Sequence, residues 1–439
     1  MTNKKSITVL YPQRGIGGAQ VLFARVAEFF CRDSDFEVTV IDYSDGYISR
    51  FLDSHKCHFY LMPFDECSRI SLPPDTICLT ALSHWSWFNK TIEAKDETRI
   101  FLWDIHPFNL VEHTAFSGLY KNLSVERARS ILNLLEKRRS VSLCRLVEKG
   151  TAQQGIAFMC GKNYEYNRRL FGIHSSPNYL PIPIVVPEIV RNTQIPCEGT
   201  LGRLEIGWLS RLDDRKTRVL FGLLEDIATY QKQNVDSRLS VHVIGIGYKS
   251  SAVADLAKSL GVSIHMARPL KDSALDEYIK TAGINLAFSM GTSALEFAVR
   301  GVPTVLTPGS VLDNIVAPAK YRWLFDSENY DISSEPHDVS RGVVKGLNDI
   351  VQEIKSPGAF LRLGRLCRQY AIDNHALSGV MNRLLEYIYE DSFTLGEMRG
   401  TGVFENPIQE KFLFLAKDAY KKLFRRYYRT NTFIYEKPA

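Results

Sequence analysis

Residues 7–32 have the sequence ITVLYPQRGIGGAQVLFARVAEFFCR, which predicts a strand, a glycine-containing loop and a helix in that order. The first residues, Ile7–Tyr11, are of the β-branched and aromatic types that favour strands. After the glycines, apolar residues recur at helical spacing from Ala19 to Arg32. A strand that leads directly into a helix is the repeating unit of a parallel sheet, so this stretch predicts an α/β domain.

The same alternation continues to about residue 180 and begins again at residue 204. Five prolines between positions 177 and 196 separate the two runs, and proline continues neither a helix nor a central strand. We therefore predict two doubly wound, Rossmann-like domains, residues 1–183 and 200–390, followed by a helical extension over residues 391–439. Further strands are expected at residues 36–43, 58–62, 76–82, 99–104, 204–209, 239–244, 262–265, 284–288 and 304–307, and a late helix at Val339–Ile354.

The composition is that of a globular protein. The 439 residues are 45% hydrophobic and 23% charged, which excludes a disordered chain, and the net charge of +5 does not imply a nucleic-acid partner. None of the eight cysteines forms a Cys-x-x-Cys pair, so reduced thiols are expected. No secretory signal or 18-residue apolar stretch is evident, and we expect a cytoplasmic protein.

Two groups with metal-binding residue types are set aside. His55, Cys57 and His58 are close together but precede a strand and have no fourth partner. Asp33 and Asp35 fall in a turn between a helix and a strand. No metal site is predicted.

Three segments carry candidate binding chemistry. The first is Gly17-Gly18, where the absence of side chains lets a ligand approach the backbone and the helix N-terminus favours an anion. Gln20 breaks the G-x-G-x-x-G dinucleotide pattern. A tight turn between strand and helix is the alternative.

The second segment is residues 210–216, SRLDDRK, between a strand and a helix. Arg211 and Lys216 are placed to converge outside the carboxyl end of the sheet. A guanidinium and an ammonium together suit a diphosphate. A solvated charged loop is the alternative.

The third segment, residues 288–305, reads FSMGTSALEFAVRGVPTV. We expect Ser293 to cap a helix that Gly301 ends. The amides around Gly291 and Thr292 would then face a phosphate, and Glu296 would accept from a ribose hydroxyl. An exposed helical acid is the alternative for Glu296.

In order and spacing, these segments resemble the GT-B glycosyltransferases, close to retaining family 4, over about residues 6–390. The resemblance implies two domains facing a cleft. It implies that Arg211 and Lys216 neutralise the diphosphate of the donor, that Glu296 binds its ribose, and that Gly17 and Gly18 permit close approach. His106, after the strand ending at Asp104, corresponds to a histidine that contacts the donor sugar, with His84 and His113 as nearby competitors.

One departure from the family stands out. The family places another glutamate eight residues before the one that corresponds to Glu296, and here that position is Phe288. Amides around Gly291 and Thr292, or the Ser293 hydroxyl, are expected to replace it by hydrogen bonding.

The resemblance implies transfer of a sugar from a nucleotide-diphosphate sugar to a saccharide or lipid-linked saccharide, as in bacterial surface polysaccharide assembly. It implies no cofactor or metal, and retention of configuration. The acceptor is expected at residues 82–120, although core burial is the favoured fate of the aromatic run LSHWSWF. Two alternatives remain open: a non-catalytic partner in a polysaccharide complex, and a sugar-nucleotide epimerase.

The C-terminal segment is basic and aromatic. Residues 405–439 contain eight Lys or Arg and four Asp or Glu, and Phe412–Arg429 has an aromatic stripe at helical spacing. Such a helix is typical of binding to an anionic membrane surface, here the inner face of the plasma membrane. Packing on this protein or on a partner is the alternative.

Overall fold

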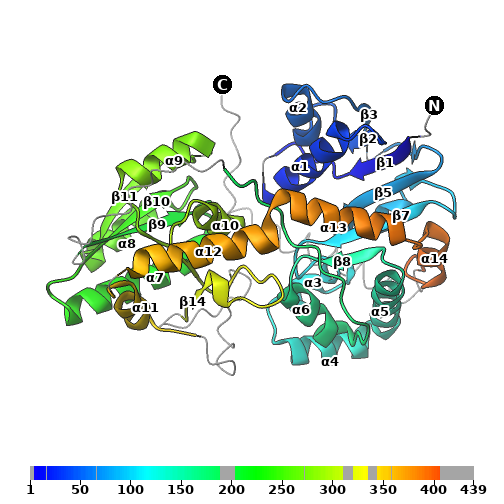
Figure 1. Cartoon of the computed structure of the whole chain (residues 1–439). Coiled ribbons are helices and arrows are strands. Elements are labelled where there is room, and N and C mark those ends of the chain that lie inside the picture. Colours follow the sequence, from blue (N-terminus) through cyan, green and yellow to red (C-terminus); the bar gives the residue numbers. More distant parts are fainter. Residues whose placement is uncertain are drawn as a thin grey trace. The chain divides into compact units, whose positions relative to one another are not determined.

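The computed structural model describes residues 4–15, 17–65, 67–187, 203–270, 272–309, 320–334, 344–356 and 358–405. The predicted helix Phe412–Arg429 lies outside these residues. The chain forms two compact units, each built on its own six-stranded sheet (Figure 1). The first unit contains the described residues up to Phe158, Lys162–Asn178, and those from Glu386 onward. The second contains Met159–Gly161 and Tyr179–Leu385.

The sheet of the first unit is entirely parallel, with strand order β3-β2-β1-β5-β7-β8. Its central strands are almost fully buried, as in sheets covered on both faces. The strand order reverses between β1 and β5, whose ends pair Leu10 with Thr80. The strands are β1 (Lys5–Leu10), β2 (Phe36–Asp42), β3 (Tyr60–Pro63), β5 (Thr76–Ala81), β7 (Arg99–Asp104) and β8 (Ile156–Phe158).

Helices follow the strands of this unit, and the chain returns to it near its end. After the last helix of the second unit, the backbone pairs with the start of β7, where Ile100 N donates to Phe393 O at 2.9 Å. The helices here are α1 (Gly18–Arg32), α2 (Tyr47–Ser54), α3 (Ser117–Tyr120), α4 (Val125–Leu135), α5 (Lys137–Ala152), α6 (Gly161–Phe171) and α14 (Leu395–Gly400).

The sheet of the second unit has the order β11-β10-β9-β12-β13-β14 and reverses between β9 and β12. All pairs are parallel except β13 with β14, and Ala287 lies opposite Gly207. The strands are β9 (Arg203–Leu209), β10 (Arg238–Ile244), β11 (Ser263–Ala267), β12 (Leu286–Ser289), β13 (Thr304–Leu306) and β14 (Arg322–Trp323). The helices are α7 (Asp214–Gln233), α8 (Ser250–Leu260), α9 (Asp272–Thr281), α10 (Thr292–Val299), α11 (Leu347–Ile354), α12 (Ala359–His375) and α13 (Leu377–Glu390).

The expected strands of both sheets are present within about two residues of their predicted bounds. The late helix differs. It starts at Leu347 because the Gly346 N–H donates to the Asp349 carboxylate, which fixes the helix start there. Residues 339–343 of that prediction lie outside the described residues.

Close packing between α12 and the connection after α10 generates a stability prediction. A Cβ added to Gly364 would lie 2.1 Å from the carbonyl oxygen of Gly301, which is backbone and cannot turn away. Gly364→Ala should therefore lower the free energy of unfolding by about 2 kcal/mol, as overpacking does.

The matched control is Gly379→Ala in α13, where an added Cβ meets nothing within 4 Å. It should raise stability by about 0.5–1 kcal/mol because alanine favours a helix. Denaturant unfolding of both variants measures the difference. Equal effects of the two substitutions would contradict the packing described.

Candidate functional site

The loop after β9 presents a cation to solvent. Asp213 caps α7, and its Oδ1 accepts from the Lys216 backbone N–H at 3.0 Å. The Arg211 side chain is 74% exposed, and its Nη2 lies 3.8 Å from Asp213 Oδ2. The cap therefore fixes the loop while the guanidinium of Arg211 remains accessible to a ligand.

Lys216 lies in the first turn of α7 and is partly buried. Burial lowers the pKa of its ammonium to about 8; Asp213 opposes this shift and the charge of Arg211 adds to it. An anion bound beside Lys216 would favour the protonated form. The pair thus combines an exposed guanidinium with an ammonium whose charge responds to a ligand.

The backbone of this loop is held by the loop after β10. Ser210 N donates to Ile244 O, and Leu212 N donates to Ile246 O, each at 3.1 Å. A Cβ on Gly245 would lie 1.9 Å from the Ser210 carbonyl oxygen, and one on Gly247 would lie 2.2 Å from that of Leu212. Only glycine at both positions permits this pairing. These two glycines are not among the residues predicted from the sequence, although G-x-G directly after a strand is a visible signal.

The connection between β12 and α10 consists of only Met290 and Gly291. Gly291 caps the helix with φ 64° and ψ −148°, a conformation that is essentially limited to glycine. No side chain caps α10, and Ser293 is its second residue. The expectation that Ser293 caps the helix is therefore wrong, because the short connection starts the helix earlier. The expected stop is confirmed, since Gly301 has φ 79° just after the helix.

The loops after β9 and β12 leave the same edge of the sheet from adjacent parallel strands. The strand order reverses between these two strands, which is where open α/β sheets bind ligands. Arg211 and Lys216 come from one loop, and Gly291, Thr292 and Ser293 from the other. The fold therefore brings the second and third candidate segments to one place on the second unit.

Glu296 is a partly buried acid held in an ion pair. Its Oε2 accepts from Arg300 Nη1 at 2.6 Å. The largely buried Arg300 guanidinium also contacts the carboxylate of Asp276 in α9. Arg300 thus fixes the orientation of the carboxylate that is predicted to bind ribose. The alternative interpretation, in which Glu296 is simply an exposed acid on a helix, does not describe this partly buried residue.

Phe288 is a core residue. It is fully buried in β12 and meets the Tyr321 ring edge-on, with centroids 4.9 Å apart. A carboxylate at this position would be buried in an apolar cluster, so the family glutamate has no counterpart here.

In the first unit, α1 begins at Gly18, with Gly17 as its cap. A Cβ on Gly18 would meet nothing within 4 Å, so no packing within the described residues requires a glycine there. A Cβ on Gly17 would lie 2.5 Å from Gln20 Oε1, the mobile end of a side chain. The space at this helix N-terminus is open.

The loop before Gly17 is fixed by buried Asp42 at the end of β2. Its carboxylate accepts from the backbone N–H groups of Gln13, Tyr43 and Ile48, each at 2.9 Å, and of Ser49 at 3.3 Å. Burial raises the pKa of Asp42, although these four amides oppose the shift.

His106 follows buried Asp104 at the end of β7. Asp104 accepts from Asn167 Nδ2 at 3.0 Å and from His106 N at 3.4 Å, and burial raises its pKa well above the usual value. His106 Nδ1 accepts from Phe108 N at 3.2 Å. A neutral ring then carries its proton on Nε2, which makes Nε2–H a hydrogen-bond donor.

The competing histidines have structural contacts. His84 is buried, lies 3.1 Å from Thr80 Oγ1 through Nδ1, and stacks on Trp87 with centroids 3.9 Å apart. Burial lowers its pKa to about 3, so it stays neutral. His113 Nε2 contacts Ser83 O at 2.7 Å. His84, Trp85 and Phe88 are buried, which agrees with the expectation that the run LSHWSWF lies in the core.

Neither a protein-family model nor a curated protein sequence matches the chain. Solved structures do. HepE from Anabaena, in complex with UDP and glucose, is 12% identical with a TM-score of 0.50, over 88% of this chain and 99% of that one. WaaB, a lipopolysaccharide outer core galactosyltransferase in its apo form, is 12% identical with a TM-score of 0.52, also over 88% and 99%. A mutant of S. aureus TarM, in complex with fondaparinux, α-GlcNAc-glycerol and UDP, is 10% identical with a TM-score of 0.51, over 87% and 99%.

These likenesses extend over both units and agree with the two Rossmann-like sheets described above. The fold class expected from the sequence is therefore confirmed. The chain has the GT-B fold of nucleotide-sugar glycosyltransferases.

Proposed function

We propose that this protein is a glycosyltransferase that moves a sugar from a nucleoside-diphosphate sugar to a saccharide or lipid-linked saccharide. One observation supports the proposal: Arg211 and Lys216 follow β9 and the N-terminus of α10 follows β12, and these adjacent parallel strands end where the strand order of the second sheet reverses. A guanidinium, an ammonium and helix-terminal amides together match the charge of a diphosphate.

In this proposal, charge that develops on the leaving diphosphate is stabilised by Arg211 and Lys216 without a metal ion. Amides around Gly291 and Thr292, with the Ser293 hydroxyl, bind the donor where the family has a glutamate. Glu296 accepts from the ribose, and Gly17 and Gly18 allow close approach of the donor.

The roles proposed for His106 and for the two domains rest on the resemblance to the GT-B glycosyltransferases. His106 donates from Nε2 to the transferred sugar, and the reaction retains configuration. Residues 200–390 bind the nucleotide sugar, and residues 1–183, through the region 82–120, bind an acceptor of bacterial surface polysaccharide synthesis.

Nucleotide binding by the full chain tests the role of the two cations. Arg211→Ala and Lys216→Met should each weaken binding of UDP, GDP or dTDP, whichever the wild type binds, by about 10- to 100-fold. The reason is that a hydrogen bond to a charged group contributes about 1.5–3 kcal/mol. The matched control is Arg238→Ala, an exposed arginine at the opposite end of β10, and it should bind as the wild type does. Calorimetry measures the constants, and a thermal melt checks folding.

Other outcomes separate the alternatives. If the wild type binds none of these nucleotides at millimolar concentration, the non-catalytic partner is favoured; the buried Phe288 in place of an acid is the observation behind that candidate. Conversion of a nucleotide sugar without any acceptor would favour an epimerase. Unchanged affinity in both cation variants would overturn the assignment of the site.

The lowered pKa of Lys216 predicts how nucleotide affinity depends on pH. Only the protonated amine attracts a diphosphate, so the Kd should change little between pH 7 and about 8 and rise toward tenfold per unit above that. Stability should change in the opposite sense. The unfolded lysine binds more protons between about pH 8 and 10.5, so unfolding of the free protein becomes less favourable across that range.

Calorimetry between pH 7 and 9 in buffers of different ionisation heat measures both the Kd and the proton uptake. Lys216→Arg keeps its charge in this range and serves as the control, with a flat profile expected. A wild-type Kd that is equally flat would show that Lys216 does not titrate in this range and would contradict the predicted pH dependence.

We also propose that the protein binds an anionic membrane surface through residues 405–439. No helix in the described parts of the chain is long and apolar enough to cross a bilayer. The last described residues lie against α5, where Arg139 Nη1 donates to Val403 O at 2.6 Å. The neighbouring helices, residues 117–152, contain eight Lys or Arg against three Glu. They also expose apolar side chains: Leu119, Leu134, Leu135 and Val141.

Flotation of the full chain with vesicles tests this proposal. Binding to vesicles with 30% phosphatidylglycerol should exceed binding to neutral vesicles and should fall in 0.5 M salt. Arg425→Glu combined with Arg426→Glu should reduce it about tenfold or more, since each basic residue near the surface contributes about 1 kcal/mol. Leu366→Ser, at an exposed apolar residue of α12, is the control. Equal flotation of wild type and the double variant would reject the tail as the membrane contact.

A further inference from the structure

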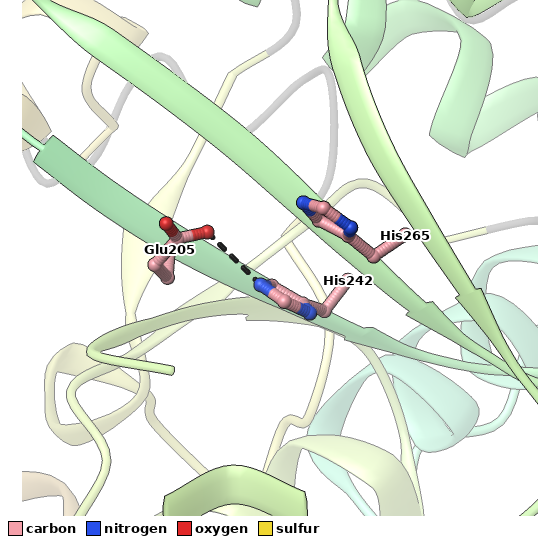
Figure 2. A group of neighbouring side chains, drawn as sticks. All are labelled: Glu205, His242 and His265. Atoms are coloured by element: carbon pink, nitrogen blue, oxygen red, sulfur yellow. Dashed lines mark hydrogen bonds and ion pairs between the residues drawn. The ribbon is translucent and has the colours of Figure 1, made fainter. Parts of the chain in front are cut away.

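Three side chains with metal-binding chemistry meet on adjacent parallel strands of the second unit. Figure 2 shows them: Glu205 on β9, His242 on β10 and His265 on β11. Each offers one potential ligand atom, and these atoms all lie within 4.8 Å of one another. His242 and His265 are direct partners in the β10–β11 register, which puts both rings on one face of the sheet.

The contacts among these residues are already polar. Glu205 Oε2 lies 2.9 Å from His242 Nε2, and His242 Nδ1 lies 3.2 Å from the Tyr278 hydroxyl on α9. The His265 ring stacks on that of His242, with centroids 4.7 Å apart. Glu205 and His242 are buried, whereas His265 is exposed, so the group is open to solvent on the side of the edge strand.

The hydrogen bonds define the protonation of His242. In a neutral imidazole one ring nitrogen carries the proton and the other accepts. A carboxylate can only accept, so Nε2 carries the proton and Nδ1 accepts from the Tyr278 hydroxyl. A metal on Nε2 requires the other tautomer, with the proton on Nδ1. The tyrosine hydroxyl can then accept that proton in a hydrogen bond, because a hydroxyl both donates and accepts. Tyr278 therefore supports either state without moving.

We propose that Glu205, His242 and His265 bind a zinc ion, with water in the fourth position. Two imidazoles and a carboxylate are a donor set that zinc accepts, and bonds of about 2.0–2.2 Å place tetrahedral ligand atoms about 3.4 Å apart. To bind the ion, Glu205 Oε2 and His242 Nε2, now 2.9 Å apart, must separate slightly. The other pairs of ligand atoms must approach by about 1.4 Å or less. The exposed His265 on an edge strand supplies that movement, and Tyr278 orients His242 as an outer-sphere partner.

The ion would tie an edge strand to the centre of its sheet. Among the described strands, β11 pairs only with β10, and the ion would link it to β9 as well. The three residues lie within the strands rather than at the carboxyl edge that carries Arg211 and Gly291. The zinc site therefore neither depends on nor forms part of the proposed donor site, and its predicted effect is on stability.

One side chain opposes the ion. The Arg203 guanidinium pairs with Glu205 Oε1, and a zinc ion would have to share this carboxylate with it. The Arg203 side chain is 64% exposed and can turn into water. Removing this charge should therefore favour the metal.

The test titrates zinc chloride into the full chain after chelator treatment and dialysis. We expect one zinc per chain, with a Kd of about 1 µM or tighter, and a Tm that rises by about 2 °C or more in excess zinc. His265→Gln should weaken binding at least 100-fold, and because His265 is exposed this variant should still fold. Tyr278→Phe should weaken it about 10-fold, as loss of an outer-sphere partner does. Arg203→Gln should tighten it several-fold.

A control separates this site from a competing one. His58→Gln alters the histidine beside Cys57 and should leave the affinity unchanged. Cobalt substitution provides the spectrum, in which visible bands without thiolate charge transfer are expected. Three results would overturn the proposal: no zinc bound at 100 µM, equal affinity in His265→Gln and wild type, or thiolate charge transfer, which would place the metal on cysteine.

Discussion

The candidate donor site depends on a backbone pairing between two loops. The strands β9 and β10 end at Leu209 and Ile244, but their hydrogen bonding continues into the loops, through Ser210 to Ile244 and Leu212 to Ile246. The carbonyl oxygens of residues 210 and 212 occupy the space that side chains at 245 and 247 would fill. Two glycines therefore hold the chain that presents Arg211 and starts α7, and with it the position of Lys216.

The charges at this edge of the sheet are unequally compensated. Arg300 is largely buried and contacts two carboxylates, those of Glu296 and Asp276. Arg211 and Lys216 both lie near Asp213, whose Oδ1 already accepts from a backbone amide. A buried guanidinium needs partners to offset its desolvation, whereas an exposed one is hydrated and remains accessible to a ligand. The first group therefore fixes the orientation of Glu296, and the second leaves positive charge for an anion.

The sequence predicted those features that repeat or are contiguous. Strands such as Arg99–Asp104 and Leu239–Ile244 are apolar runs between turn signals, and the strand-loop-helix order placed Arg211, Lys216 and Gly291 at one sheet edge. β8 escaped prediction because three buried residues, Ile156–Phe158, show no periodicity. The group of Glu205, His242 and His265 escaped because its members are 37 and 23 residues apart, and only the register of parallel strands joins them. The prediction that Ser293 caps α10 was wrong because the connection between β12 and α10 is only two residues long.

The short connection between β12 and α10 adjoins the position at which the family has a glutamate and this chain has Phe288. Ser289 ends β12 and Thr292 begins α10, so only Met290 and Gly291 lie between them, and neither carries a carboxylate. The position that the family fills with glutamate is instead in the strand, where Phe288 packs against Tyr321. The same two-residue connection brings the first turn of α10 to the end of the sheet, and the positive φ of Gly291 sets the direction of that turn. Backbone N–H groups donate hydrogen bonds, whereas a carboxylate accepts them. Replacing the glutamate by amides therefore changes which groups of the nucleotide sugar can bind here. Amides favour phosphate or carbonyl oxygens, whereas a glutamate favours sugar hydroxyls. A sugar hydroxyl can still accept from an amide N–H, so these amides can contact the transferred sugar, but they cannot accept from its hydroxyls as a glutamate does. If the chain transfers a sugar, acceptors for those hydroxyls must therefore come from other groups, such as the Ser293 hydroxyl.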